Sequence, residues 1–360
     1  MTTTTPDTAP DETRREEGTP AKVLRVVLTE RVALLAILLV VLLVWMTWLD
    51  RNDYLVAPYD VSYLASALES MVPLCVLALA ELLVMVSGRG GIDLSVGSIV
   101  SLAGMAFGFM VGQWHWPMLP ALLVTLVAGL VLGAVNGVLV AYLRVPPLIA
   151  TLATYYGYSS LALVSNDDAP ISTKPVQDLH SLTRDVALPG TGNAVTFPLQ
   201  VFTFLLPCVV VIWLVVNRTT YGRKLYAVGT NDVAARFAGI SVPWVRFRAF
   251  TLAGLLSAVV AVVTVGQFAS ARPDAGTVGN GMALPAITIA VLGGVAISGG
   301  VGRVGGVAAA ALLVTWLNAG ILLMFEGDQG SQYQLLALGL VLVGSALLNA
   351  VTLRRYGSLQ

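Results

Sequence analysis

The residues of this chain that could take part in chemistry are few and lie far apart. Glu69 and Glu81 lie in one apolar run. A carboxylate inside a membrane is costly and generally faces water or a polar partner, so each could hydrogen-bond a polar solute or bridge two helices. We favour the bridging role for Glu81 and keep both roles open for Glu69. Further polar candidates for a solute path are Asn136, Thr151 and Thr154.

The sequence contains no set of residues typical of an enzyme or of a metal site. It has two histidines, His115 and His180, and two cysteines, Cys75 and Cys208, without a nucleophile–base pattern or metal spacing. The phosphate-binding motif GxxxxGK[ST] is absent, so the segment Gly299–Gly306 predicts a tight turn rather than a phosphate cradle. We therefore expect no catalytic residue, no metal and no cofactor in this chain.

A polar segment, Tyr221–Ile240, interrupts the apolar sequence and carries the signals of a short helix. Thr230 or Asn231 can accept the exposed N–H groups at its start, and Asp232 complements the helix dipole there. Gly239 is a typical residue after a helix end. So short a helix is not stable alone in water, so its apolar side chains must pack against this chain's own inner face or against another subunit.

A glycine-rich turn precedes one of the apolar runs and reads Gly-Gly-Ile-Asp-Leu-Ser-Val-Gly-Ser. Its notable residues are Gly90, Gly91, Asp93, Ser95 and Gly97. Asp93 and Ser95 favour the start of a helix, because a carboxylate accepts exposed N–H groups and suits the positive end of the dipole. A proton or cation site at Asp93 is the alternative, and we favour capping.

The composition places these residues in an all-α integral membrane protein. Hydrophobic residues make up 57% of the 360 and charged residues 11%, against about 25% charged in soluble domains. The net charge of zero argues against a nucleic-acid partner. Apolar runs of sufficient length predict a polytopic bundle of about ten transmembrane helices. They cover 32–49, 63–87, 93–112, 118–142, 147–165, 198–216, 247–267, 282–297, 304–325 and 333–351.

Two series of glycines predict how these helices pack. The members of each series are four residues apart: Gly104, Gly108 and Gly112, and then Gly129, Gly133 and Gly137. Small residues at this spacing let helix backbones approach closely within lipid, where little hydrophobic force acts between helices. We therefore expect packing faces here rather than the lining of a pore.

The basic residues predict how the chain crosses the membrane. With an internal N-terminus, all but four of the 20 basic residues fall in cytoplasmic segments, as the positive-inside rule requires. The external four are Arg51, Lys174, Arg184 and Arg272. Both termini are therefore expected to be cytoplasmic.

The predicted organisation is one transmembrane domain, 26–352, between two cytoplasmic tails. The tail 1–25 is rich in Thr, Pro and acidic residues and is expected to be disordered, and the tail 353–360 is short. The external loop 166–197 is long enough to contact a partner or to be an ordinary surface loop. The cytoplasmic loop 217–248 contains the polar segment.

Several motifs together resemble one family of membrane proteins. They are the glycine-rich turn at 90–98, the polar segment 221–240, Val-Asn-Gly at 135–137 followed by 146–152, and Leu-Gly-Gly at 292–294 leading into 298–300. The chain resembles, over about residues 60–350, the permease subunits of bacterial ABC importers for monosaccharides such as ribose, xylose, arabinose, galactose and autoinducer-2. Arg89 departs from the small residue usual before the paired glycines, and the acidic N-terminal tail is additional.

This resemblance implies a transport subunit of the bacterial cytoplasmic (inner) membrane that is not itself an enzyme. One or two partner ATP-binding cassette subunits would bind ATP and Mg, an extracytoplasmic sugar-binding protein would deliver the solute, and a second permease copy or a paralogue would complete the pore. The loop 217–248 would hold a coupling helix that docks on the ATPase subunit. Its expected contact residues are Thr230, Asn231, Asp232, Ala234, Ala235, Arg236, Phe237, Gly239 and Ile240.

Two other transporter classes remain as alternatives. A branched-chain amino-acid ABC permease is the nearest, although the glycine-rich turn favours the sugar group. An ion-coupled secondary transporter would also be a helical bundle with buried carboxylates.

Overall fold

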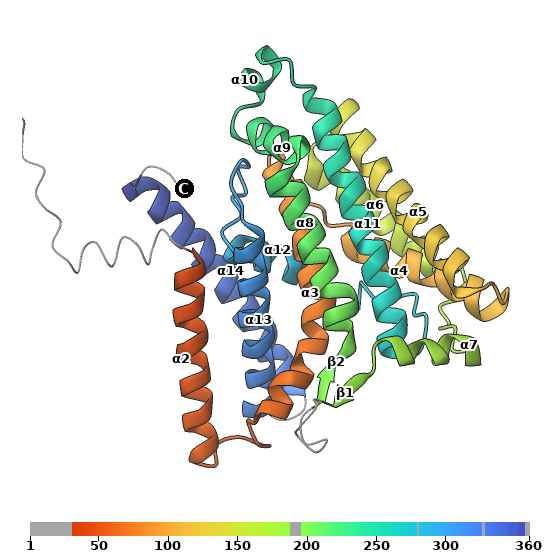
Figure 1. Ribbon diagram of the computed structural model, residues 1–360, viewed down its shortest axis with the longest axis vertical. Helices are drawn as coiled ribbons and strands as arrows, with labels where there is room; N and C mark the ends of the chain where they lie inside the picture. The colour runs from red at the N-terminus through yellow and green to blue at the C-terminus, as the bar shows by residue number, and fades with distance from the viewer. Residues whose placement is uncertain (1–30, 188–195, 279–280, 326–327, 357–360) are drawn as a thin grey trace, which may run out of the picture.

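The computed structural model describes residues 31–187, 196–278, 281–325 and 328–356, which form an almost entirely helical molecule (Figure 1). The helices are α2 (Arg31–Arg51), α3 (Val61–Val86), α4 (Val96–Gly108), α5 (Met118–Gly137), α6 (Pro147–Val164), α7 (Lys174–Gln177), α8 (Leu206–Arg218), α9 (Thr220–Thr230), α10 (Asp232–Phe237), α11 (Val242–Phe268), α12 (Ala283–Leu292), α13 (Val304–Met324) and α14 (Asp328–Tyr356). Short π-helical turns extend α4 and α5 and lead into α8, at Phe109–Gln113, Val138–Tyr142 and Val201–Leu205. The expected N-terminal tail 1–25 lies outside the described residues, and α14 continues into the expected C-terminal tail.

Eight of the described helices are long and apolar enough to cross a membrane, which confirms the all-α polytopic class. They are Arg31–Arg51, Val61–Val86, Val96–Gln113, Met118–Tyr142, Val201–Arg218, Val242–Phe268, Val304–Met324 and Gln329–Leu347. The other two predicted spans correspond to α6, which carries several Thr, Tyr and Ser side chains, and to α12, which has only 10 residues. Gly294, at φ 90°, follows α12 and turns the chain away from the helix axis.

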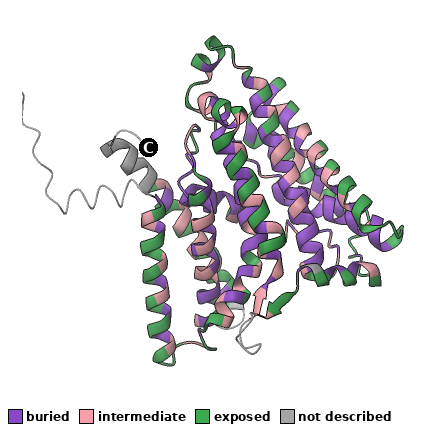
Figure 2. Cartoon of the chain, viewed as in Figure 1, coloured by how far each residue is buried: buried purple, intermediate pink, exposed green. Residues whose placement is uncertain are grey.

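The helices form a buried centre and an apolar periphery. Most of α3, α4 and α11 is buried, whereas less than a fifth of the spans in α2, α8 and α14 is buried. Figure 2 shows the exposed residues along α2 and α8. Exposed leucine and valine in such numbers would promote aggregation in water, but they match the hydrocarbon of a bilayer.

The glycines of α5 make its contact with α11. A Cβ added at Gly133 would lie 2.4 Å from the carbonyl oxygen of Phe250, and one at Gly254 would lie 2.2 Å from that of Gly129. The two backbones therefore touch, as the four-residue spacing predicts. This contact joins the peripheral α5 to the buried α11.

The polar segment and the long predicted external loop lie at opposite ends of the bundle. Figure 1 shows α9 and α10 at one end, and α7 with the hairpin of β1 (Asp185–Ala187) and β2 (Thr196–Pro198) at the other. The strands pair antiparallel, with Val186 opposite Phe197. This arrangement agrees with the prediction that the two segments face opposite sides of the membrane, while the orientation itself stays a prediction.

Candidate functional site

The short helix predicted within the polar segment is α10, and Asn231 caps it. The side-chain oxygen of Asn231 accepts hydrogen bonds from the N–H groups of Val233 (3.1 Å) and Ala234 (3.0 Å). Thr230, the other predicted cap, is instead the last residue of α9, and its hydroxyl donates to the carbonyl oxygen of Tyr226. Gly239 follows the helix at φ 77°, the conformation that a terminating glycine adopts.

One side of α10 is anchored and the other faces away from the chain. Ala235 is buried, and Ile240 packs partly against the core. Phe237 is 90% exposed and Val233 57% exposed. Packing on the chain's own helices therefore accounts for Ala235 and Ile240 but not for Phe237, which presents a whole aromatic ring to its surroundings.

A buried arginine of α11 ties α10 to the end of α3. The guanidinium of Arg246 donates to the Asp232 carboxylate at 3.3 Å and to the carbonyl oxygen of Ser87 at 3.3 Å. Arg236 approaches the same carboxylate at 3.6 Å from the exposed side. The buried, paired Arg246 therefore links α10 to α11 and to the end of α3 through charge-assisted hydrogen bonds.

The first half of the polar segment forms a helix that the sequence interpretation missed. Residues Thr220–Thr230 form α9, whose Leu225 and Val228 are fully buried. The hydroxyl of Tyr226 donates to the carbonyl oxygen of Gly302. Burial raises the pKa of Tyr226, with a smaller opposing effect from Arg303, so the group remains a donor. Apolar residues at three-residue spacing (Leu225, Val228) were the available signal.

Two glycine-containing turns, one after α3 and one before α13, meet the last turn of α9, and we call Gly88, Gly229, Gly299 and Gly300 the glycine junction. A Cβ at Gly229 would lie 1.9 Å from the Val86 carbonyl oxygen, and one at Gly299 would lie 2.3 Å from the Gly88 Cα. The N–H of Gly300 donates to the Val86 carbonyl oxygen at 3.1 Å. The junction thus joins backbone to backbone at the ends of α9, α3 and the turn before α13.

Four of the five predicted path residues and the glycine-rich turn form one polar cluster, which is buried except for the half-buried Thr154. Its members are Glu81, Asp93, Ser95, Asn136, Thr151 and Thr154. The Ser95 hydroxyl donates to the Asp93 carboxylate (2.6 Å) and accepts from the Asn136 amide (2.7 Å). The Thr154 hydroxyl donates to the Asn136 amide oxygen (2.7 Å). These bonds connect the turn before α4 to α5 and α6.

The glutamate of this cluster adds α3 to the same network. A carboxylate oxygen of Glu81 accepts from the N–H of Asp93 at 3.3 Å, and the Thr151 hydroxyl donates to the Ile92 carbonyl oxygen at 3.3 Å. Glu81 and Asp93 are fully buried, and among the described residues each keeps one oxygen without a donor. The bridging role favoured for Glu81 fits this geometry, because the fully buried carboxylate links α3 to the turn before α4.

The glycines of the turn fit its tight path, and Asp93 lies just before α4. Gly90 has φ 65°, and a Cβ at Gly91 would lie 2.5 Å from the Val84 carbonyl oxygen. Gly97 lies within α4, where a Cβ would lie 2.3 Å from the carbonyl oxygen of Gly276. Asp93 accepts from the N–H of Ser95 at 2.9 Å, and α4 begins at the next residue without a side-chain cap. Asp93 thus shapes the turn that leads into the helix.

Glu69 lies apart from the polar cluster, nearer the other end of α3. Its backbone carbonyl accepts from the Gln267 side chain at 3.0 Å, and that amide also donates to Gln200 at 2.8 Å. The half-buried Glu69 therefore belongs to a glutamine-lined region on the side of the β1–β2 hairpin.

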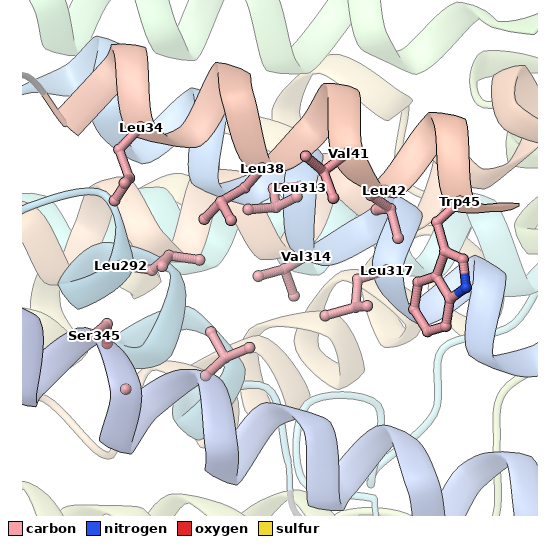
Figure 3. A pocket seen from close by; sticks show the side chains of 12 residues that line it. Leu34, Leu38, Val41, Leu42, Trp45, Leu292, Leu313, Val314, Leu317 and Ser345 are labelled. Atoms are coloured by element: carbon pink, nitrogen blue, oxygen red, sulfur yellow. The ribbon is translucent and has the colours of Figure 1, made fainter. Parts of the chain in front are cut away.

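A groove of about 350 Å³ between α2, α13 and α14 has an almost wholly apolar wall. Figure 3 shows Leu38 and Val41 of α2 facing Val314 and Leu317 of α13 across it. A polar solute would lose its hydration there without gaining hydrogen bonds. This groove suits hydrocarbon rather than a polar solute.

A family model and curated relatives match most of the chain. Residues 63–346 match the family described as "Branched-chain amino acid transport system / permease component". The autoinducer 2 import system permease protein LsrD of Klebsiella pneumoniae is 36% identical over 266 residues, covering 73% of this chain and 76% of the relative. The ribose import permease protein RbsC of Bacillus subtilis is 35% identical over 260 residues, covering 72% and 76%. No solved structure matches the chain.

Proposed function

The chain belongs to the family of transport-system permease components, and on this premise we propose that it is the membrane-spanning subunit of an ATP-driven importer. It would carry a monosaccharide or a similar small polar solute across the bacterial cytoplasmic membrane. The relatives whose names specify autoinducer 2 and ribose favour such a cargo over a branched-chain amino acid, although the family description names the latter.

The exposed Phe237 on α10 is the observation that carries the proposed mechanism. α10 is capped, anchored through Ala235 and Arg246, and presents Phe237 and Val233 outward. An exposed aromatic side chain on a capped and anchored short helix suits a groove of an ATPase subunit. That subunit, and not this chain, would bind ATP and Mg. The resemblance described above gives this segment the same role.

The transmission path would run from α10 into the buried centre. Closure of the ATPase subunits would push α10, and the contacts of Asp232 with Arg246 and of α9 with the glycine junction would pass the displacement to α11, α3 and α13. Small shifts of such docked elements can switch a packed bundle between two states. The bundle would then alternate between outward-open and inward-open forms, with solute delivered by an external binding protein.

Reconstitution tests this function directly. The chain is purified with its ATPase partner and binding protein, and uptake of radiolabelled solute into liposomes is measured with ATP, without ATP, and with an imposed ion gradient. We expect co-purification of the ATPase and uptake that stops without ATP. Uptake that follows the ion gradient and ignores ATP would instead identify a secondary transporter.

A further inference from the structure

Most of α11 is buried, and Arg248 is the first residue of a narrow side that stays uncovered. Leu252, Leu255 and Val259 follow it at spacings of four, three and four residues and are half-buried, whereas the residues between Leu252 and Val259 are otherwise buried. Residues at these spacings share one face of a helix. An exposed cation therefore precedes an apolar stripe, which we call the α11 stripe (Leu252, Leu255 and Val259).

Aromatic rings hold the guanidinium of Arg248. It lies over the Trp244 ring, 4.6 Å from the ring centroid. Trp244 stacks on Phe247 at 5.3 Å, and Phe247 meets Tyr142, at the π-helical end of α5, edge-on at 5.9 Å. A cation–π contact uses one face of the guanidinium and leaves its N–H groups, which lie in its plane, able to donate to an anion.

The charge of Arg248 has no counter-charge in the described part of the chain. Arg248 forms no ion pair with any described residue. Arg272, beyond the other end of α11, lies over Phe268 in the same manner at 5.0 Å, but its guanidinium approaches the Asp274 carboxylate at 3.6 Å. The fold thus gives one of these two stacked arginines a carboxylate and leaves the other without one.

The titratable group beside Arg248 is a neutral phenol. Burial raises the pKa of Tyr221 in α9, and the nearby charge of Arg248 partly opposes this effect. The Tyr221 hydroxyl donates to the Val245 carbonyl oxygen at 3.3 Å, which joins α9 to α11. Tyr221 therefore shapes the surroundings of Arg248 without neutralising it.

The side chains around Arg248 are those of a membrane–water boundary. Trp244 and Tyr142 are about half exposed, and the exposed Arg144 follows Tyr142 by two residues. Tryptophan and tyrosine are enriched at the headgroup level of a bilayer. The predicted orientation places this level in the cytoplasmic leaflet, whose anionic lipids attract basic side chains.

The position of Arg248 favours a lipid over the partner subunit proposed for α10. Figure 1 shows α10 beyond the ends of α8 and α11, so a soluble subunit that covers Phe237 approaches from outside the bilayer. The α11 stripe runs from Arg248 in the opposite direction, into the membrane-spanning part of the helix. An occupant that pairs with Arg248 and also covers the stripe needs an anionic head and an apolar chain.

We propose that Arg248 and the α11 stripe form a binding site for an anionic glycerophospholipid of the cytoplasmic leaflet. Its phosphate would accept hydrogen bonds from the Arg248 guanidinium, whose planar N–H groups match phosphate geometry, and one acyl chain would cover the stripe. A zwitterionic lipid would bring its own cation to an end of the bundle that already carries Arg248 and Arg144, so a net anionic headgroup fits better. The inference depends on the membrane location of the chain and not on its transport function.

Lipid binding by the purified full chain tests the headgroup contact. The chain in detergent is titrated with phosphatidylglycerol or phosphatidylcholine, and bound lipid is counted by native mass spectrometry. We expect Arg248→Gln to weaken phosphatidylglycerol binding about fivefold and to leave phosphatidylcholine binding unchanged. The matched control is Arg272→Gln, which removes a stacked arginine that already has a carboxylate. Equal binding of phosphatidylglycerol by the two variants overturns the proposal.

Photo-crosslinking tests the place of the acyl chain. Phosphatidylglycerol with a photoreactive acyl chain is added to the full chain in phosphatidylcholine nanodiscs, and the crosslinked peptides are identified by mass spectrometry. We expect adducts at 252–259 that Arg248→Gln removes, while adducts at the exposed Val131 and Val135 of α5 persist. Adducts on both helices that do not change in Arg248→Gln show annular lipid only and overturn the site.

A contact of Arg248 with the ATPase subunit is the other outcome. If Arg248→Gln binds phosphatidylglycerol as the unmodified chain does but no longer co-purifies with the ATPase, the arginine serves that subunit and the lipid proposal is wrong. Loss of phosphatidylglycerol binding with co-purification retained supports the lipid site. Neither result decides the transport function, which ATP-dependent uptake by the unmodified protein tests separately.

Discussion

At the scale of single residues, Phe237 distinguishes a docking helix from an ordinary loop. Its neighbours Asn231 and Ala235 hold α10 in place, so the exposure of the ring is not a consequence of a loose segment. A fully exposed aromatic side chain gains stability only when another surface covers it.

Replacing the Phe237 ring with a carboxylate should weaken the docking of this chain on the ATPase subunit without unfolding the chain. We expect Phe237→Asp to reduce ATP-dependent uptake at least about tenfold, because a hot-spot contact is worth about 2 kcal/mol or more. The melting temperature of the isolated chain should stay the same, since the side chain is 90% exposed. The matched control is Lys224→Ala on the exposed side of α9; if Phe237→Asp transports as well as this control does, α10 is not the docking element.

Glu81 is expected to act through its hydrogen bond rather than through its charge. Glu81→Gln keeps an oxygen that can accept from the Asp93 N–H, so unfolding temperature and uptake should remain near those of the unmodified protein. Glu81→Ala removes that acceptor and leaves a cavity, which should destabilise the chain by about 2 kcal/mol or more. Thermal unfolding in detergent checks both, and loss of uptake in a stable Glu81→Gln protein would show that the charge itself is required.

At the scale of elements, the glycine junction connects α9 to the buried centre. No side chain fits at Gly229, because its Cβ would overlap the Val86 carbonyl oxygen. The addition of one methyl group at Gly229 should therefore displace α9.

Gly229→Ala should displace α9 from the end of α3 and weaken the link between ATP hydrolysis and uptake. We expect a loss of about 1–3 kcal/mol of stability from the overlap and fewer solute molecules transported per ATP. The control is Gly157→Ala in α6, where no atom lies within 4 Å of the added Cβ, so the better helix propensity of alanine should leave the chain as stable or more so. Equal coupling ratios in the two variants would argue against the junction as a transmission element.

The elements also show where interpretation of the sequence succeeded. The start and end of α10 were predictable because capping is local: Asn231 and Gly239 act on N–H groups and backbone angles within a few residues. α9 was missed, because so short a helix is stable only when the tertiary fold buries Leu225 and Val228.

At the scale of the whole molecule, the predicted orientation is open to a direct measurement. Ser181→Cys, beside α7, and Lys224→Cys, in α9, are placed in a chain without native cysteines. An impermeant maleimide added to intact cells should label Ser181→Cys alone, and Lys224→Cys should react only after the membrane is permeabilised. The reverse pattern would invert the positive-inside assignment.

The sequence by itself determined that this is an integral membrane protein, most of its membrane spans, the residues that start and end α10, and the family resemblance. Each of these rests on composition or on neighbours within a few residues, and the family comparison supports the last of them. Only the tertiary structure decided that Glu81, Asn136 and Thr154 share one polar cluster, and that two glycine turns meet the end of α9. These are contacts between segments far apart in sequence, and they depend on which faces the helices turn toward one another when they pack.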